Sequence, residues 1–300
     1  MNIQLSASVS QALANGDPVV ALESTIISHG FPRPRNLEVG KLLEATVRQH
    51  GAVPATIAVL DGVAHVGLEP DQLERLALED GIEKCSARDL PLVSAAGGSG
   101  ATTVAATCHL AAMAGVKVFA TGGIGGVHRH AERTMDVSAD LRQLATSPVV
   151  VISAGAKSIL DLGLTLEVLE TYGVPVVGLG CDEMPAFYTR TSGHFLTQRV
   201  DDIETLAKAV IAQQSLGLTG GMLVCNPIPQ EAALDADEVE GWIQAALAKA
   251  EAQGIAGKAL TPFLLGELVE RSGGQTLGAN IALAKNNAQV GARLAVELCK

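Results

Sequence analysis

The chain has 300 residues, of which 48% are hydrophobic and 18% charged, so it can bury a full core. This composition excludes a disordered chain and a small disulfide-stapled protein. The formal net charge is −11, and no run of Lys and Arg interrupts the acidic balance, so we expect no broad nucleic-acid-binding surface.

Short runs of apolar, β-branched residues predict buried strands. In chain order they are Pro18–Leu22, Ala55–Leu60, Val116–Ala120, Val149–Ser153, Val174–Gly178 and Met222–Cys225. The dipeptide Asp61-Gly62 separates two apolar runs and is typical of a hairpin, so we expect at least one antiparallel pair.

Helical patterns lie between these strands, and Asn36 is predicted to cap the first of them. The others are Pro70–Glu79, Ala101–Ala114, Ser158–Tyr172, Ile203–Gln214, Asp237–Gln253, Thr261–Ser272 and Asn280–Leu298. Alternation of strand and helix predicts a three-layer α/β/α fold with a mixed, mostly parallel sheet and a helical C-terminal region. No linker or repeat interrupts residues 1–300, which we expect to form a single domain.

One segment, Leu90–Val116, lacks Asp, Glu, Lys and Arg and is long enough to cross a membrane. The glycines of Gly97–Gly100 and the polar Thr102, Thr103 and His109 favour a buried loop and helix instead. The N-terminus has neither a basic nor an apolar stretch, so we expect no signal peptide. The five cysteines are scattered and include no CxxC pair, which favours a reducing cytoplasm.

Two charged side chains follow predicted strands, where ligands bind in open α/β sheets. Glu23 follows the first strand, and the alternative is a helix cap or a surface carboxylate. Lys157 follows the fourth strand among small residues, with no carboxylate within three positions. Burial of an unpaired ammonium favours the neutral, nucleophilic amine; the alternative is a solvated lysine that opens a helix.

Two glycine-rich turns also follow strands. The first, Thr121–Val127, can bring backbone N–H groups against an anion, but it lacks the spacing of a dinucleotide-binding fingerprint. The second, Gly97–Thr103, lacks the lysine of a P-loop. These patterns disfavour a nicotinamide oxidoreductase and a nucleoside triphosphatase.

Asp136 and Asp140 lie four residues apart, and either carboxylate could hold a hard divalent cation. Equally, Asp136 or Ser138 could cap the helix that opens at Leu141. His128 and His130 rarely would face one centre at this spacing, so we interpret them as a polar loop.

Other polar residues offer weaker signals. Lys84 and the pair Arg88-Asp89 could bind a phosphate and supply its ion pair, or they could be surface charges. Four amides could recognise a neutral heterocycle: Asn226, Asn280, Asn286 and Asn287.

Long segments in a fixed order carry a family resemblance that spans nearly the whole chain: ALESTIISHG (21–30), PATIAVLDG (54–62), GATTVAAT (100–107), VFATGGIGGVHR (118–129), SAGAKSILD (153–161), NPIP (226–229) and TPFLL (261–265). The chain resembles the pseudouridine-5′-phosphate glycosidases, also called pseudouridylate synthases, which are related to indigoidine synthase A.

The resemblance implies cleavage of the C–C bond between uracil and ribose 5-phosphate by a homotrimer with a divalent cation, usually manganese. It also implies that Lys157 is the Schiff-base nucleophile, Glu23 the proton donor and Asp136 the metal position. The substrate contacts that it implies are Lys84, Val104, Ser138, Ala139, Asp140 and Asn280. A C-glycoside has no heteroatom leaving group for paired carboxylates to protonate, which agrees with a lysine route.

The sequence departs from this family at two places. Lys84–Leu90 reads KCSARDL, with one arginine fewer than the family's KVSRRDL, and Gly97–Gly100 lacks a lysine often found there. Two other functions stay open: a different sugar-phosphate lyase or aldolase that uses Lys157, and a non-catalytic phosphosugar-binding protein.

Overall fold

The computed structural model describes residues 3–300, apart from the side chain of Lys258. Eleven strands form one sheet: β1 (Ile3–Leu5), β2 (Val19–Leu22), β3 (Val53–Leu60), β4 (Val63–Val66), β5 (Glu83–Cys85), β6 (Gly100–Thr102), β7 (Val118–Ala120), β9 (Val150–Ser153), β11 (Val176–Leu179), β12 (Gln198–Val200) and β13 (Met222–Cys225). A separate two-stranded sheet pairs β8 (Val127–His128) with β10 (Leu160–Asp161) in antiparallel fashion.

Helices connect these strands. They are α1 (Ala7–Asn15), α2 (Thr25–Gly30), α3 (Arg35–Gln49), α4 (Pro70–Leu78), α5 (Leu90–Ala95), α6 (Val104–Ala114), α7 (Ala131–Thr134), α8 (Ala139–Thr146), α9 (Leu162–Thr171), α10 (Ile203–Ser215), α11 (Ala236–Ala252), α12 (Leu260–Arg271) and α13 (Gln275–Glu297), with short 3₁₀ turns at Gln230–Ala232 and Gly257–Ala259.

The strand order of the large sheet is β1-β4-β3-β2-β7-β9-β13-β11-β12. From β3 to β12 the neighbours are parallel, whereas β4 and β6 run antiparallel to β3. The predicted mixed, mostly parallel sheet is therefore confirmed, and all six predicted strands lie in it. The chain leaves β2 for β3 on one side and later places β7 on the other side. In open parallel sheets, ligands bind outside the carboxyl ends of the strands at such a reversal, which here lies between β2 and β7.

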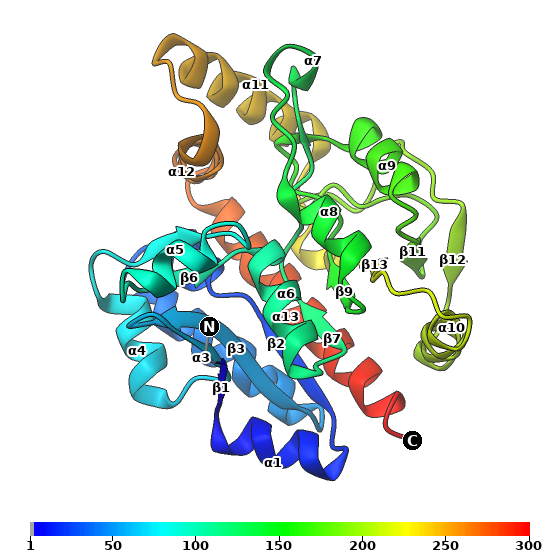
Figure 1. Ribbon diagram of the computed structural model, residues 1–300. Helices are drawn as coiled ribbons and strands as arrows, with labels where there is room; N and C mark the ends of the chain where they lie inside the picture. Colours follow the sequence, from blue (N-terminus) through cyan, green and yellow to red (C-terminus); the bar gives the residue numbers. More distant parts are fainter. Residues whose placement is uncertain (1–2) are drawn as a thin grey trace.

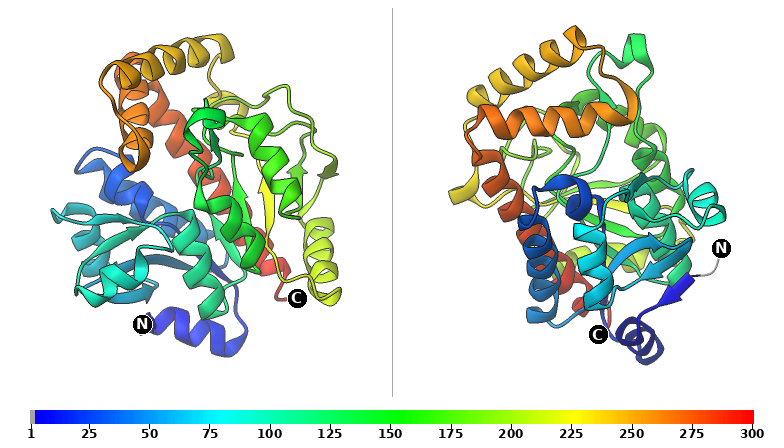
Figure 2. Two further views of the ribbon diagram at one scale, coloured as in Figure 1. Left: turned by 45° about the horizontal axis from the view of Figure 1, so that its top comes forward. Right: turned by 90° about the vertical axis from the view of Figure 1, so that its left-hand side faces the viewer.

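Helices cover both faces of the sheet, as the three-layer prediction requires (Figures 1 and 2). The long α13 packs on β2, β7 and β9, and α3 and α10 pack beside it. Gly291 allows α13 to lie close to β7, since a Cβ atom at this position would lie only 3.2 Å from the Cβ of Ala120. On the other face α6 packs on β2, β3 and β4, and α8 packs on α6. The α11 and α12 helices form a hairpin that stands at the top of Figure 1, away from the sheet.

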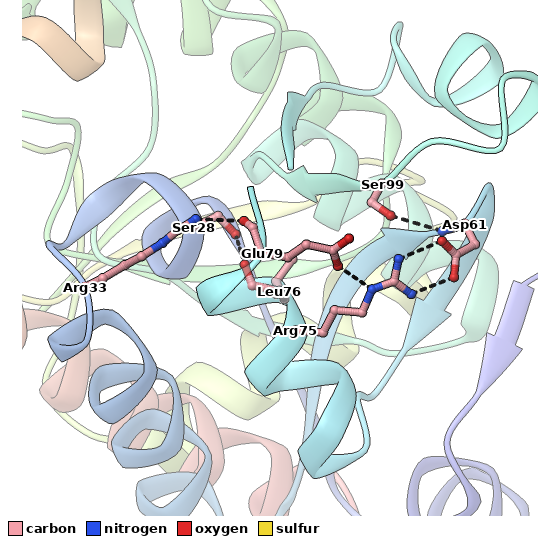
Figure 3. A network of polar contacts seen from close by, with 7 residues as sticks. All are labelled: Ser28, Arg33, Asp61, Arg75, Leu76, Glu79 and Ser99. Atoms are coloured by element: carbon pink, nitrogen blue, oxygen red, sulfur yellow. Dashed lines mark hydrogen bonds and ion pairs between the residues drawn. The ribbon is translucent and has the colours of Figure 1, made fainter. Parts of the chain in front are cut away.

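The hairpin predicted at Asp61-Gly62 joins β3 to β4, and both residues have positive φ angles of 51° and 78°. Two such residues in succession match the twist of a two-residue hairpin. Figure 3 shows that the Arg75 guanidinium donates to both carboxylate oxygens of Asp61 at 2.6 and 2.7 Å. The Asp61 N–H donates to the Ser99 hydroxyl at 3.1 Å, which ties the turn to the neighbouring loop.

Four helix starts differ from the sequence predictions in position or capping. The helix predicted from Asn280 begins at Gln275, directly after Gly273 and Gly274, which have positive φ angles. The helix predicted from Ala101 begins at Val104, because residues 100–102 pair as a strand with β3 and β5. The helix predicted from Ser158 begins at Leu162, because Leu160 and Asp161 pair with β8. Asn36 is no cap: it lies inside α3, and its amide donates to two carbonyls, of Ile27 at 3.1 Å and Ala77 at 2.7 Å.

The uncharged segment 90–116 folds as α5, β6 and α6, in agreement with the predicted loop and helix. Within residues 3–300, no helix is both long and apolar enough to cross a membrane. The structure shows no disulfide between cysteines of the described residues.

Candidate active site

Glu23 directly follows β2, at the point where the strand order reverses between β2 and β7. Its side chain is buried, and its two carboxylate oxygens accept hydrogen bonds from the hydroxyl groups of Thr25 and Thr121. Thr121 directly follows β7, so neighbouring strands supply the carboxyl and one of its donors. The sequence analysis missed both threonines, since a hydroxyl after a strand is a common feature.

Lys157 follows β9 after a sharp turn at Gly155, which has a φ of +75°. A Cβ atom there would lie 2.1 Å from the carbonyl oxygen of Pro185, so only glycine fits. The half-buried Lys157 Nζ donates to the carbonyl oxygen of Gly123 at 2.7 Å. Across the described chain no carboxylate forms an ion pair with this amine. The Gly123 carbonyl that accepts from this amine is a neutral group.

One tripeptide connects the two groups. Glu23 contacts the side chain of Thr121, and Lys157 contacts the backbone of Gly123, two residues further on. Cα atoms two residues apart are separated by at most about 7 Å. The structure therefore brings the carboxyl and the amine to the same short segment at the sheet edge.

Asp140 links two other parts of this region. Ser138 caps α8, as one of the alternatives predicted, and Asp140 lies in the first turn of that helix. Its carboxylate is buried and accepts backbone N–H groups of Ala105 at 2.9 Å and Gly125 at 2.8 Å. The start of α6, the start of α8 and the glycine-rich turn are therefore held together, and each oxygen keeps one further lone pair for a substrate hydroxyl.

A positively polarised corner forms where α6 and α8 begin. The Thr103 side chain caps α6, and Lys84 lies on β5 beside β6, which leads into this helix. No described residue accepts a hydrogen bond from the N–H of Val104 or of Ala139, the first residues of α6 and α8. Vacant N–H groups at helix N-termini beside a lysine suit a phosphate. By contrast, Arg88 is exposed, and its guanidinium lies 3.9 Å from Asp89.

His128 joins this group, although the sequence analysis placed it in a polar loop. Burial lowers the pKa of His128, Asp136 opposes that shift, and Lys84 and Lys157 add to it. These four side chains are thus electrostatic neighbours, whereas His130 is exposed and pairs with Glu132. Burial, and then Lys84, also lowers the pKa of His29. The position of His128 just after the glycine-rich turn was the one available signal.

The two carboxylates considered for a cation differ in what they contact. Both oxygens of Asp140 are bound to backbone N–H groups, whereas no described residue donates to the half-buried carboxylate of Asp136. In residues 3–300 no three His, Cys, Asp or Glu side chains gather as a metal cluster. A cation at Asp136 would therefore be held mainly through water, which hard ions such as Mg²⁺ and Mn²⁺ accept.

Three of the four candidate amides are already used within the protein. Asn287 Nδ2 donates to the carbonyl of Thr121 at 2.7 Å, and Asn226 Nδ2 donates to Asn287 Oδ1 at 2.8 Å. Asn286 Nδ2 donates to the carbonyl of Pro227 at 3.2 Å. Asn280 differs: its side-chain oxygen is buried without a partner, and it would lie 3.3 Å from a Cβ atom at Gly122. A buried acceptor of this kind fits an N–H group of a ligand.

The glycines of residues 121–126 allow close packing against neighbouring side chains and backbone. The N–H groups of Ile124, Gly125 and Val127 donate to protein oxygens. A Cβ atom at Gly123 would lie 2.5 Å from Phe187 Cδ2, and one at Gly125 would lie 2.3 Å from Ser138 Oγ. This turn is therefore closely packed on neighbouring loops.

Comparisons with known proteins agree with this arrangement. Residues 8–297 match the family described as "Indigoidine synthase A like protein". Proteins named "Pseudouridine-5'-phosphate glycosidase" from Caldanaerobacter subterraneus subsp. tengcongensis and Staphylococcus aureus are each 54% identical, over 99% of this chain and 97% of theirs. One of the same name from Rhodospirillum centenum is 58% identical, over 98% of this chain and 92% of its own.

Two solved structures have the same fold. The prealnumycin C-glycosynthase AlnA, in complex with ribulose 5-phosphate, is 42% identical with a TM-score of 0.92 and covers 100% of this chain and 97% of its own. An indigoidine synthase A-like protein from Thermotoga maritima is 35% identical with a TM-score of 0.91, at the same coverage.

Proposed function

This chain belongs to the indigoidine synthase A-like family, and we propose that it cleaves pseudouridine 5′-phosphate to uracil and ribose 5-phosphate. Relatives at 54% identity over nearly the full length bear the name of that glycosidase. The related AlnA binds a pentulose 5-phosphate. The observation that carries the proposal is the attachment of Glu23 and Lys157 to one tripeptide, Thr121 to Gly123.

The first step opens the ribose ring. The Lys157 amine bonds to C1′ while the bond from C1′ to the ring oxygen breaks, and Glu23 gives its proton to that oxygen. The nitrogen then loses a proton and is a neutral amine. Its lone pair forms a C1′=N iminium as the bond from C1′ to C5 of uracil breaks, and C5 takes a proton.

The second step releases the sugar. Water adds to the iminium, the bond from C1′ to Nζ breaks, and ribose 5-phosphate leaves as its aldehyde while the lysine is restored. The net reaction consumes one water. Asp140 has a free lone pair on each oxygen and is suited to orient a sugar hydroxyl.

The remaining residues bind the two ends of the substrate. In this proposal, the phosphate is bound by Lys84, the N–H groups of Val104 and Ala139 and the Ser138 hydroxyl, which lie on or next to the starts of α6 and α8 and on β5. The unpartnered Asn280 oxygen suits an N–H group of uracil. Asp136 would hold a divalent cation, Mn²⁺ in our proposal, which supplies positive charge next to the phosphate-binding corner. A homotrimer and a cytoplasmic location remain predictions.

Product analysis tests the substrate. Purified protein with pseudouridine 5′-phosphate and Mn²⁺ is expected to yield uracil and ribose 5-phosphate in equal amounts, measured by chromatography. Release of a sugar fragment without uracil would instead support a different lyase or aldolase, and binding without turnover would support a phosphosugar-binding protein.

Borohydride trapping tests the nucleophile. With ribose 5-phosphate present, reduction is expected to add the mass of the sugar to Lys157, and Lys157→Arg is expected to abolish the adduct. Lys208, exposed on α10, offers the control: Lys208→Arg should label like the parent protein. An adduct on any other lysine would contradict the assigned role.

A further inference from the structure

One ion pair joins the candidate active site to the outlying helix α11. The Arg129 guanidinium donates to both carboxylate oxygens of Glu240, at 2.6 and 2.8 Å. Gln244, one turn further along α11, donates to the same carboxylate at 2.7 Å. The side chains of Arg129 and Glu240 are 21% and 49% exposed, so the pair is partly shielded from water. Hydrogen bonding from Arg129 lowers the pKa of Glu240, which keeps the carboxylate charged.

Arg129 also lies between two segments that carry site residues. It follows His128, whose N–H donates to the backbone carbonyl of Asp136 at 3.0 Å. Its guanidinium donates to the carbonyl of Ser158 at 3.3 Å, next to Lys157. The small sheet of β8 and β10 joins the same two segments, but it has only two residue pairs. A short ladder alone fixes their spacing poorly.

Backbone hydrogen bonds join the two segments at one end, where the N–H of Lys157 donates to the carbonyl of Ile124 at 3.1 Å, but the side near Arg129 is more open. Arg129, Ser158 and Glu240 all line a cavity of about 630 Å³, together with Asp161 at the end of β10. The Ser158 hydroxyl is buried without a hydrogen-bond partner. Space on one side of the two segments means that side-chain packing does not fix them there. On this open side the planar fork of Arg129 reaches both Glu240 and the carbonyl of Ser158, and a lysine could not form its parallel hydrogen bonds.

We propose that Arg129 and Glu240 are a positioning pair, through which α11 sets the spacing between the segment of Asp136 and the turn of Lys157. Neither side chain touches the reacting atoms. This inference rests on the proposed roles of Lys157 and Asp136. It gives the α11 and α12 hairpin, which stands away from the sheet, a part in the reaction (Figure 1).

The variant Glu240→Gln removes the charge and keeps the shape. We expect kcat to fall about 10-fold with little change in KM, because a small misplacement of a catalytic group slows the chemical step. Arg129→Lys is expected to behave alike, since it loses the fork. The control is Glu238→Gln, an exposed glutamate on the same helix with the same change of charge, which should leave kcat unaltered.

Hydrogen–deuterium exchange supplies a readout that does not depend on turnover. Peptides that cover residues 127–137 and 157–161 are expected to exchange faster in Glu240→Gln than in Glu238→Gln. If the parent protein fails to cleave pseudouridine 5′-phosphate, this measurement still decides whether the pair holds the two segments. Equal exchange in the two variants, or a lower melting temperature with kcat and exchange unchanged, would overturn the proposal.

Discussion

Carboxylates at the candidate active site and at the β3–β4 hairpin are held by different kinds of donor. Glu23 and Asp140 are buried and accept from hydroxyl or backbone N–H groups, all of them neutral. Asp61 and Glu79 are exposed, and the Arg75 guanidinium lies between them (Figure 3). A neutral donor orients a carboxylate without cancelling its charge, whereas an exposed ion pair competes with water and salt. The comparison separates the buried carboxylates of the candidate site, which have neutral donors, from the exposed carboxylates of the hairpin region, which form ion pairs.

The largest expected effect is on catalysis. Glu23→Gln cannot supply the proton for ring opening, so kcat should fall by a factor of about 10²–10⁴ while the fold is kept. Glu44→Gln is the control, because Glu44 lies outside the site and is also buried; it accepts from the Thr56 hydroxyl at 2.7 Å and, unlike Glu23, also from Arg48 at 2.9 Å. Steady-state kinetics on both variants measure the difference. A near-normal rate for Glu23→Gln would remove it from the acid role.

The second effect is on stability. In Asp140→Asn one N–H donor of Ala105 or Gly125 faces the new NH₂ group and loses its acceptor, which costs about 1–3 kcal/mol. Thermal unfolding should show this as a loss of at least about 2 °C. Asp71→Asn, an exposed change in α4, serves as reference. Identical melting temperatures for the two variants would show that the bonds of Asp140 contribute nothing net.

Orientation of the acid should be separable from its chemistry. Thr121→Val removes one hydroxyl donor to Glu23, and we expect about a 10-fold fall in kcat, with KM nearly constant. Thr121→Ser restores the hydroxyl and should recover most of the rate. If the serine variant is as slow as the valine variant, the hydroxyl is not the group that matters.

Substitution in the exposed network should do little. Arg75→Gln removes both bonds to Asp61 and one to Glu79, whose side chains are 67% and 44% exposed. The melting temperature is expected to change by no more than about 2 °C, and kcat not at all. A loss as large as that of Asp140→Asn would erase the contrast between the two regions.

The smallest effect concerns pH. Hydrogen bonding from Arg75 lowers the pKa of Asp61 in the folded protein. A lowered carboxyl pKa contributes stability above the unfolded value, about 3.9, and that contribution is lost as the pH falls through the folded value. The difference in melting temperature between the parent and Asp61→Asn should thus be constant above about pH 5 and shrink below pH 4. A difference that grows on acidification would contradict this sign.

The sequence was informative where burial alone decides structure. Runs such as Val150–Ser153 are β-branched and buried on both sides of the sheet, so their composition identifies them as strands. Composition did not identify Gly100–Thr102 as a strand, because three small residues are too short a run to distinguish a strand from the start of a helix. Its pairing with β3 and β5 decides, and these partners lie far away in the sequence.

The site shows the same division. Glu23 and Lys157 could be nominated because each follows a strand that is easy to recognise. The contacts of Thr121 and the neighbours of His128 depend on which strands lie side by side and on how one turn packs, which no local pattern reports. The side-chain oxygen of Asn280 has no hydrogen-bond partner, whereas the amide of Asn287 donates to the Thr121 carbonyl. This difference depends on how α13 packs against the glycine-rich turn, so the sequence alone could not predict it.

The shared attachment at Thr121 to Gly123 has a mechanical consequence. The Glu23 carboxyl and the Lys157 amine are both hydrogen-bonded to this tripeptide. Thermal motion of the tripeptide therefore moves both groups in the same direction and leaves their separation nearly constant. Two anchors on unrelated loops would drift independently. If the two groups act as proposed, their alignment would therefore survive movement of the sheet edge during substrate entry.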